Sequence, residues 1–235
     1  MDGRSRSPRN NLGDMSLTTL EDALLRAVET HISQDDPAHA LAHILEVVRL
    51  ARWILREVEA DERIVIAAAY CHDLRSRREV GFEEAVGRSA SEAAVILRNL
   101  GYSECEIRDV AECIVSASWE HHLAGGKPSS LEASVLRDAD WLEAMGAHGI
   151  ARVFAFAGTY RLPLAFVDGD PEHPARLSAT LDGPDPSPFH HFYSKLLWLM
   201  PELVTEPARR EGSRRHRILV DFLKEYREEM RRTDA

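Results

Sequence analysis

The sequence predicts an all-α fold, built as one domain with a long irregular segment late in the chain. Apolar residues recur at spacings of three and four over most of the 235 residues, as they do on one face of a helix. No run alternates apolar and polar residues between hairpin turns, so strands are not predicted. The sequence has no internal repeat, and residues 17–235 are therefore expected to form a single helical domain.

The elements follow in chain order. Residues 1–16 are polar without periodicity and are expected to be a disordered tail, with Met15 as an alternative start. A helix follows over 17–28. Asp36 is suited to the N-cap and Pro37 to the first position of a helix that runs to about residue 59. The next helix, over 62–74, is apolar all round, which is typical of a helix in the core.

The second half of the chain is assigned in the same way. A helix over 82–100 ends at Gly101, a favourable C-cap residue. Helical patterning also covers 103–119, a helix that begins after Ser129 and Ser130 and reaches Met145, and two last helices over about 188–204 and 207–231. Residues 158–188 are rich in Pro, Gly and Asp and are predicted to be a long irregular loop, which is usually functional or mobile.

Composition excludes several classes of protein. The net charge of -10 argues against a nucleic-acid or polybasic membrane binder. The longest apolar stretches, such as Ile64–Cys71, fall far short of the ~20 residues that cross a bilayer, and the first twenty residues lack the apolar part of a signal peptide. The three cysteines form no C-x-x-C pair, as expected for reduced thiols. We therefore expect a cytoplasmic protein, and its oligomeric state stays open.

Residues with metal-ligand chemistry occur in three short groups: His39 and His43, His72 and Asp73, and Asp138 and Asp140. The first two lie four apart and share a helix face. The second pair ends an apolar helix, where a charge is costly unless it is compensated. A lone histidine on a helix is more often an ordinary core or surface residue. The joint pattern, however, indicates a bound cation such as Mn, Fe, Zn or Mg.

This order of motifs resembles the HD-domain superfamily of metal-dependent phosphohydrolases, whose signature is H…HD…D on an all-helical fold. The resemblance covers roughly residues 36–229. It is greatest to a bacterial branch of single-domain members that resemble nucleotide pyrophosphohydrolases. The matching segments are DPAHALAH from Asp36, CHD from Cys71, DADWLEAMGA from Asp138, HFYSKL from His191 and the pair Arg215-His216.

The resemblance implies a divalent metal ion of Mn, Mg, Fe, Co or Zn type held by His43, His72, Asp73 and Asp140. Asp73 would also accept a proton from water. His39 would face the substrate or support a ligand, and Asp138 would orient a histidine or a water molecule. Both are therefore counted with Asp73 among the candidate catalytic residues.

Five further residues are candidates for binding substrate phosphate: Lys195, Arg215, His121, His122 and His191. Lys195 would act as a point charge on a phosphate, although an exposed helix lysine is the plainer alternative. His121 and His122 could serve as a second-metal ligand and a general acid, or could simply end a solvated helix. Departures from the branch at Glu46, at residues 74–76 and at Ala117 leave the substrate open.

The preferred reaction, implied by the resemblance, converts a (d)NTP to a (d)NMP and pyrophosphate by means of a metal-activated water. The resemblance thus implies a small phosphorylated substrate, a nucleotide, and we expect neither a nucleic acid nor a membrane as a partner. Three alternatives stay open: a 5'-nucleotidase-type phosphomonoesterase, a non-catalytic nucleotide-sensing or metal-stabilised module, and a metal oxygenase on the same scaffold.

Overall fold

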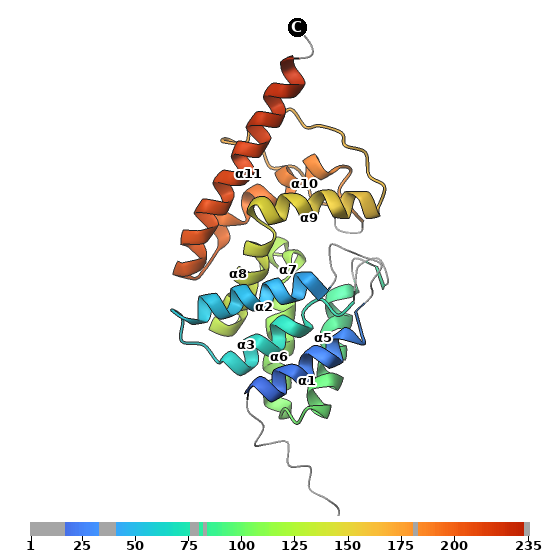
Figure 1. Ribbon diagram of the computed structural model, residues 1–235, viewed down its shortest axis with the longest axis vertical. Helices are drawn as coiled ribbons and strands as arrows, with labels where there is room; N and C mark the ends of the chain where they lie inside the picture. The colour runs from blue at the N-terminus through green and yellow to red at the C-terminus, as the bar shows by residue number, and fades with distance from the viewer. Residues whose placement is uncertain (1–16, 33–40, 76–79, 82–83, 181–182, 233–235) are drawn as a thin grey trace, which may run out of the picture.

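The computed structural model describes residues 17–32, 41–75, 80–81, 84–180 and 183–232 (Figure 1). Regular structure in these ranges is entirely helical, which confirms the predicted fold class. The helices that matter below are α1 (Leu17–Glu29), α2 (Leu41–Leu55), α3 (Glu62–Cys71), α5 (Ala85–Asn99), α6 (Glu104–Ala117), α7 (Trp119–Leu123), α8 (Leu131–Glu143), α9 (Gly146–Thr159), α10 (Pro188–Ser194) and α11 (Glu206–Arg232).

Side-chain caps set the starts of the helices in the lower half of Figure 1. Asp61 accepts hydrogen bonds from the backbone of Arg63 and Ile64 at the start of α3, and Ser130 accepts one from Ala133 at the start of α8. Ser103 and Glu106 form a reciprocal capping box on α6. Such caps satisfy N–H groups that have no partner within the helix. The predicted caps Asp36 and Pro37 lie outside the described residues.

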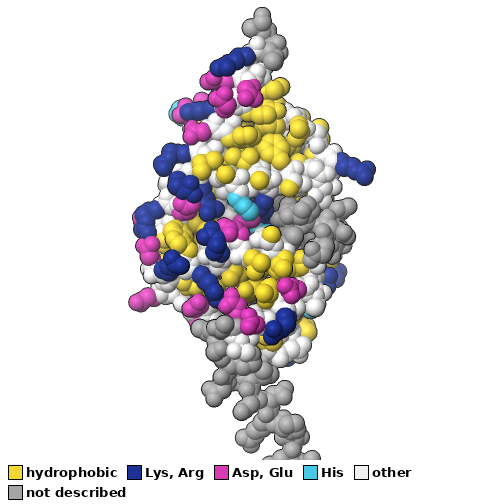
Figure 2. All heavy atoms as spheres, viewed as in Figure 1, with side chains coloured by type: hydrophobic (Ala, Val, Ile, Leu, Met, Phe, Trp, Pro, Cys, Tyr) yellow, Lys and Arg dark blue, Asp and Glu magenta, His cyan; other side chains and the backbone are white. Residues whose placement is uncertain are grey.

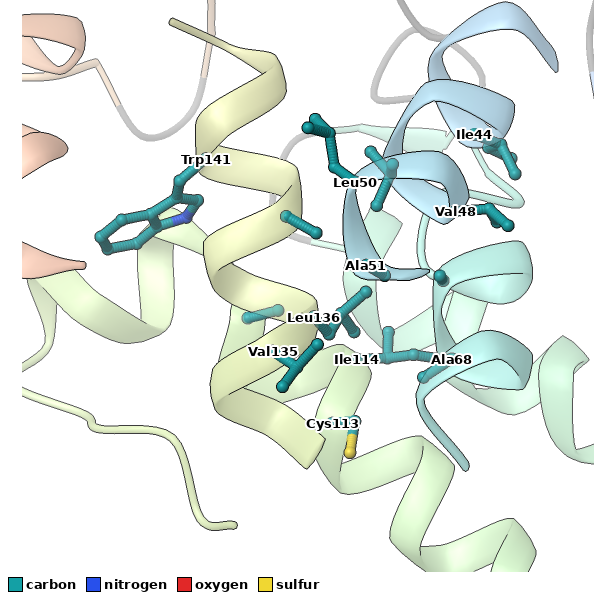
Figure 3. Close-up of a cluster of buried hydrophobic side chains, with 14 of the residues drawn as sticks. Ile44, Val48, Leu50, Ala51, Ala68, Cys113, Ile114, Val135, Leu136 and Trp141 are labelled. Carbon is teal, nitrogen blue, oxygen red and sulfur yellow. The ribbon is translucent and has the colours of Figure 1, made fainter. Parts of the chain in front are cut away.

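Helix α8 lies at the centre of the molecule and is buried on two sides. Leu136 and Val135 pack against α2 and α6, whereas Trp141 leaves the other side of the helix (Figure 3). The apolar helix α3 is buried from Ile64 to Cys71, as its sequence predicts. This packing holds α2, α3 and α8 side by side. The predicted metal ligands lie on α2, on α8 and in the turn that directly follows α3.

The upper half of Figure 1 contains α9, α10, α11 and the irregular segment that precedes α10. An aromatic cluster joins them: the ring centroids of Phe189 and Tyr226 are 4.4 Å apart, and Phe154 lies 5.6 Å from Phe189. Asp168 in the irregular segment pairs with Arg227 of α11 at 2.8 Å. The segment is therefore attached to the helices beside it, and no helix or strand occurs in its described part, residues 160–180 and 183–187.

Several predicted boundaries were wrong: the helix expected to reach about residue 59 ends at Leu55, and the helix expected over 103–119 ends at Ala117. Sequence patterning assigns no element to residues 146–157, yet the chain turns at Gly146, with φ of +72°, and forms the separate helix α9. The predicted helix over 188–204 stops at Ser194 and continues as two short 3₁₀ turns. The indole Nε1 of Trp198 donates a hydrogen bond to the carbonyl of Tyr193, so this carbonyl in the last turn of α10 does not accept one from a continued helix. Pro201 has no N–H that could continue the helix.

None of the described helices is long and apolar enough to cross a membrane.

Candidate metal centre

Two histidine rings meet where the end of α3 faces α2. The Nε2 atoms of His43 and His72 are 3.0 Å apart. His72 is the C-cap residue of α3, and its Nδ1 lies 2.8 Å from the carbonyl of Ala69, which accepts the proton of that nitrogen. His43 Nδ1 lies 3.2 Å from Oε1 of Glu143. Because each Nδ1 faces an acceptor, both Nε2 atoms are expected to present lone pairs to the same point.

Two carboxylates complete this group. Asp140 Oδ1 is 3.6 Å from Nε2 of His43 and 3.8 Å from Nε2 of His72. Asp73 Oδ2 is 3.9 Å from Nε2 of His43. The exposed fraction of the side chain rises from 4% for His43 through 10% for His72 and 14% for Asp73 to 25% for Asp140. The histidines therefore form the closed side of the site, and the carboxylates lie at its open side.

The donor atoms fit a divalent metal ion. Bonds of about 2.0–2.2 Å to nitrogen and oxygen place two ligands of one ion about 3–4 Å apart, which is the range of the distances among His43, His72 and Asp140. The three offer ligand atoms that all lie within 4.8 Å of one another. Burial, followed by the nearby charge of Arg152, lowers the pKa of His43, and the neutral ring is the form that binds metal.

Glu143 supports this site from the side away from the open end. It is fully buried one turn after Asp140 on α8, and it accepts a hydrogen bond from His148 Nε2 at 2.8 Å. Its other oxygen binds the guanidinium of Arg152. Burial acts to raise the pKa of Glu143, but the donor and cationic groups around it, His43 and Arg152 foremost, hold it below its usual range. A carboxylate therefore lies behind the His43 ring.

Asp138 has a different environment, although it lies only two residues before Asp140. Its carboxylate is fully buried and accepts hydrogen bonds from the backbone N–H of Val204, at 3.0 and 3.1 Å, and of Thr205, at 2.6 Å. These donors lie just before α11 begins at Glu206. Burial raises the pKa of Asp138 while the backbone donors act against that rise. The contacts favour a role in joining α8 to the start of α11.

A cavity lies between α7, α9, α10 and the irregular segment. Its polar and aromatic lining includes Trp119, Arg152, Phe156, Asp185, His191 and Lys195. Arg152 belongs both to this cavity and to the Glu143 cluster, so one side chain connects the cavity with the metal ligands. On the face shown in Figure 2, a histidine lies in the middle of the molecule between two apolar areas, with basic and acidic side chains beside it.

The cationic residues of the cavity are held in place by their neighbours. Asp185 is buried, and its Oδ2 accepts hydrogen bonds from His191 Nδ1 at 2.7 Å and from Ser194 Oγ at 2.6 Å. Burial acts to raise the pKa of Asp185, but the contacts with His191 lower it below its usual range. Lys195 is half-buried, with its Nζ 5.8 Å from the centroid of the Trp119 ring. It is therefore not an exposed surface lysine.

The chain is similar to several known proteins. The family model for the HD domain matches residues 40–145, a range that contains His43, His72, Asp73 and Asp140. A solved structure described as an HD-superfamily hydrolase from Bacillus thuringiensis is 25% identical, with a TM-score of 0.65, covering 92% of this chain and 99% of the other. Residues 40–145 of this chain therefore form an HD domain. The chain is thus similar to an HD-superfamily hydrolase, and its group of His43, His72 and Asp140 could hold a metal ion.

The chain is also similar to the uncharacterized protein YpgQ of Bacillus subtilis. It is 29% identical over 209 residues, which cover 88% of this chain and 92% of YpgQ. A crystal structure of YpgQ in complex with ADP is 27% identical, with a TM-score of 0.65, and the match covers 89% of this chain and 97% of that one. The similarity therefore extends well beyond the HD domain into the helices that line the cavity.

Arg215, a predicted phosphate-binding residue, does not line the cavity. Arg215 is buried and donates to the carbonyl of Leu142 at 2.7 Å and to Glu211 at 2.7 Å, next to Gly146. These contacts hold the end of α8 and do not line the cavity. His39 lies outside the described residues, so its predicted role stays a prediction.

His121 and His122 belong to α7 and do not join the three-residue ligand group found among the described residues. His121 Nε2 lies 3.4 Å from the carbonyl of Lys127, in the loop that follows α7. The ring of His122 stacks on Trp119 with centroids 4.9 Å apart, and burial lowers the pKa of His122. Their contacts are thus with the α7 region, and the structure shows no direct contact with His43 or His72.

Sequence reasoning missed four polar residues of the HD site and its cavity: Glu143, His148, Arg152 and Asp185. A signal existed for the first three. Glu143 follows Asp140 by one helical turn, and His148 and Arg152 are four apart, which places them on one face of α9. Asp185 lies in an irregular segment, where no periodicity indicates which side chains point inward.

Proposed function

We propose that this protein is a metal-dependent phosphohydrolase that acts on a nucleotide. The observation that carries the proposal is the meeting of the two Nε2 atoms of His43 and His72 at 3.0 Å, with Asp140 at the open side. Two neutral imidazole nitrogens with facing lone pairs repel each other unless a proton or a cation lies between them. The adjacent carboxylates favour a divalent cation.

His43, His72, Asp73 and Asp140 would hold the ion, of Mn, Mg, Fe, Co or Zn type. When bound, it would polarise a phosphoryl oxygen and make a water molecule more acidic. The carboxylates lie at the exposed side of the group, so a substrate phosphate and a water molecule can enter there. Asp73, which is 3.9 Å from His43 and 14% exposed, is the chain's own candidate to accept the proton of the attacking water.

The cavity supports a nucleotide as the substrate. Lys195, Arg152 and His191 offer donors to phosphate oxygens, and the rings of Trp119 and Phe156 line the same cavity. Aromatic faces suit the stacking of a base, and cations suit a polyphosphate. The crystal structure of the relative YpgQ contains ADP, which agrees with a nucleotide ligand in this family.

Our preferred reaction is the hydrolysis of a (d)NTP to a (d)NMP and pyrophosphate. Several cationic or donor side chains beside the metal site suit a leaving group that carries more than one phosphate. A phosphomonoesterase of the 5'-nucleotidase type is the nearest alternative, since it would use the same four ligands. A nucleotide-sensing module without turnover is the third.

A product assay distinguishes these three functions. The metal-free protein is incubated with a panel of (d)NTPs and (d)NMPs in Mn, Mg or Co, and inorganic phosphate and pyrophosphate are measured separately. Pyrophosphate from triphosphates supports the preferred reaction. Phosphate from monophosphates supports the alternative esterase, and nucleotide binding without either product supports the sensor. The His72→Ala variant, which lacks a ligand, controls for contaminating hydrolases.

A further inference from the structure

The buried carboxylate of Glu143 contacts three polar side chains, although one cation would be enough to neutralise its charge. It is fully buried at the end of α8. Oε1 lies 3.2 Å from His43 Nδ1 and 2.8 Å from His148 Nε2, and Oε2 binds Arg152. Its partners therefore come from α2 and from two successive turns of α9. One carboxylate joins these two helices behind the predicted metal site.

We infer that Glu143 is a positioning residue that holds His43 with its Nδ1 protonated and its Nε2 directed at the metal ion. This inference rests on the proposed metal site and adds to it a residue that does not itself bind the ion. Glu143 lies on the Nδ1 side of the ring, whereas His72 and Asp140 lie on the Nε2 side. A carboxylate in that place selects one tautomer and makes the ligating nitrogen more basic.

Arg152 allows this carboxylate to stay charged in the interior. An unpaired buried carboxylate would be strongly unfavourable. Arg152 supplies a compensating positive charge on Oε2 and leaves Oε1 to the two histidines. Arg152 also lines the cavity. The ion pair between Arg152 and Glu143 therefore connects the cavity with the residue that supports His43.

The test measures manganese binding to the metal-free protein by calorimetry. Glu143→Gln keeps the size and an acceptor oxygen but removes the charge, and we expect its Kd for Mn²⁺ to rise about ten-fold. Glu143→Ala, which also removes the acceptor, should raise it up to about a hundred-fold. Arg152→Met removes the positive charge that keeps the buried Glu143 ionised and should therefore also raise the Kd for Mn²⁺. Glu132→Gln, at the other end of α8, is the matched control and should not change the Kd.

Thermal melting of each variant separates a loss of fold from a loss of affinity. A second readout does not depend on the metal: in the ¹⁵N spectrum of the metal-free parent, the His43 ring should be protonated at Nδ1, and Glu143→Ala should populate the other tautomer. Parental Mn²⁺ affinity in folded Glu143→Gln and Glu143→Ala would overturn the inference while the metal site stood. Absence of Mn²⁺ binding in the parent would instead overturn the proposed site, and the inference with it.

Discussion

The Nε2 atoms of His43 and His72 face each other at 3.0 Å, although the two residues are 29 positions apart in the chain. Each ring is turned by a partner on its other nitrogen: a carboxylate for His43 and a backbone carbonyl for His72. The orientation of the two rings is thus set by protein groups that would not themselves bind the ion. Substitutions at the ligands and at their supports should therefore have different consequences.

Asp73→Ala should abolish hydrolysis and remove most of the bound metal, because a ligand charge and the proton acceptor are lost together. The measurement is metal content by elemental analysis beside the rate of product formation. Asp109→Ala, at an exposed position of α6, is the control. Full activity of Asp73→Ala with its metal retained would contradict the assignment.

Asp140→Ala and Asp138→Ala should differ sharply in spite of their proximity. The first should lose metal at nearly parental stability, because Asp140 is a partly exposed ligand. The second should keep metal affinity in the folded protein and lose roughly 2–4 kcal/mol of stability, since buried N–H groups of Val204 and Thr205 lose their acceptor. Denaturant unfolding and Mn²⁺ titration of both variants check this. Loss of metal in Asp138→Ala together with loss of stability in Asp140→Ala would contradict the two assignments.

Lys195→Ala should lower kcat/KM about ten- to a hundred-fold, as expected for the loss of one charge-assisted contact of roughly 1.5–3 kcal/mol with a phosphate. Metal content should stay at the parental level, because Lys195 lies in the cavity and not among the ligands. Lys195→Arg should recover part of the rate. Steady-state kinetics with Lys127→Ala as an exposed control tests this, and an unchanged kcat/KM would move the phosphate contact to Arg152.

Asp185 should make stability depend on pH in the acid range. Its pKa is lowered in the folded state, so the stabilisation is present above the unfolded pKa of about 3.9 and is lost as the pH falls through the lower folded pKa. Asp185→Asn should thus be less stable than the parent at pH 7, by roughly 1–3 kcal/mol. The difference should shrink below about pH 4. Urea unfolding from pH 7 to pH 3 measures it, and a constant difference would exclude the charge as its source.

The fold class could be predicted from the sequence, and so could three residues whose side chains lie close together in the structure. Helical periodicity and caps located α3 and α8, and the order of the motifs selected His43, His72 and Asp140. Asp138 shows the limit of such reasoning. Both aspartates lie on one predicted helix, and only the packing of the turn before α11 shows that Asp138 contacts backbone N–H groups.

Other features depended on contacts that no local pattern records. The break between α8 and α9 occurs within continuous apolar periodicity. It follows from Gly146, with φ of +72°, and from Gly149, where an added Cβ would lie 2.0 Å from the carbonyl oxygen of Ala144. The segment before α10 has no periodicity, so the contact between Asp185 and His191 could not be foreseen. Arg215 resembled a phosphate ligand in sequence, but its guanidinium binds the carbonyl of Leu142.

The central claim is that one divalent ion binds between His43, His72, Asp73 and Asp140. An anomalous difference map from crystals of the protein grown with Mn²⁺ tests it most directly. The account predicts a single strong peak at about 2.0–2.3 Å from the Nε2 atoms of His43 and His72 and from one carboxylate oxygen each of Asp73 and Asp140. No peak there, or a peak held by His121 and His122 instead, would contradict it.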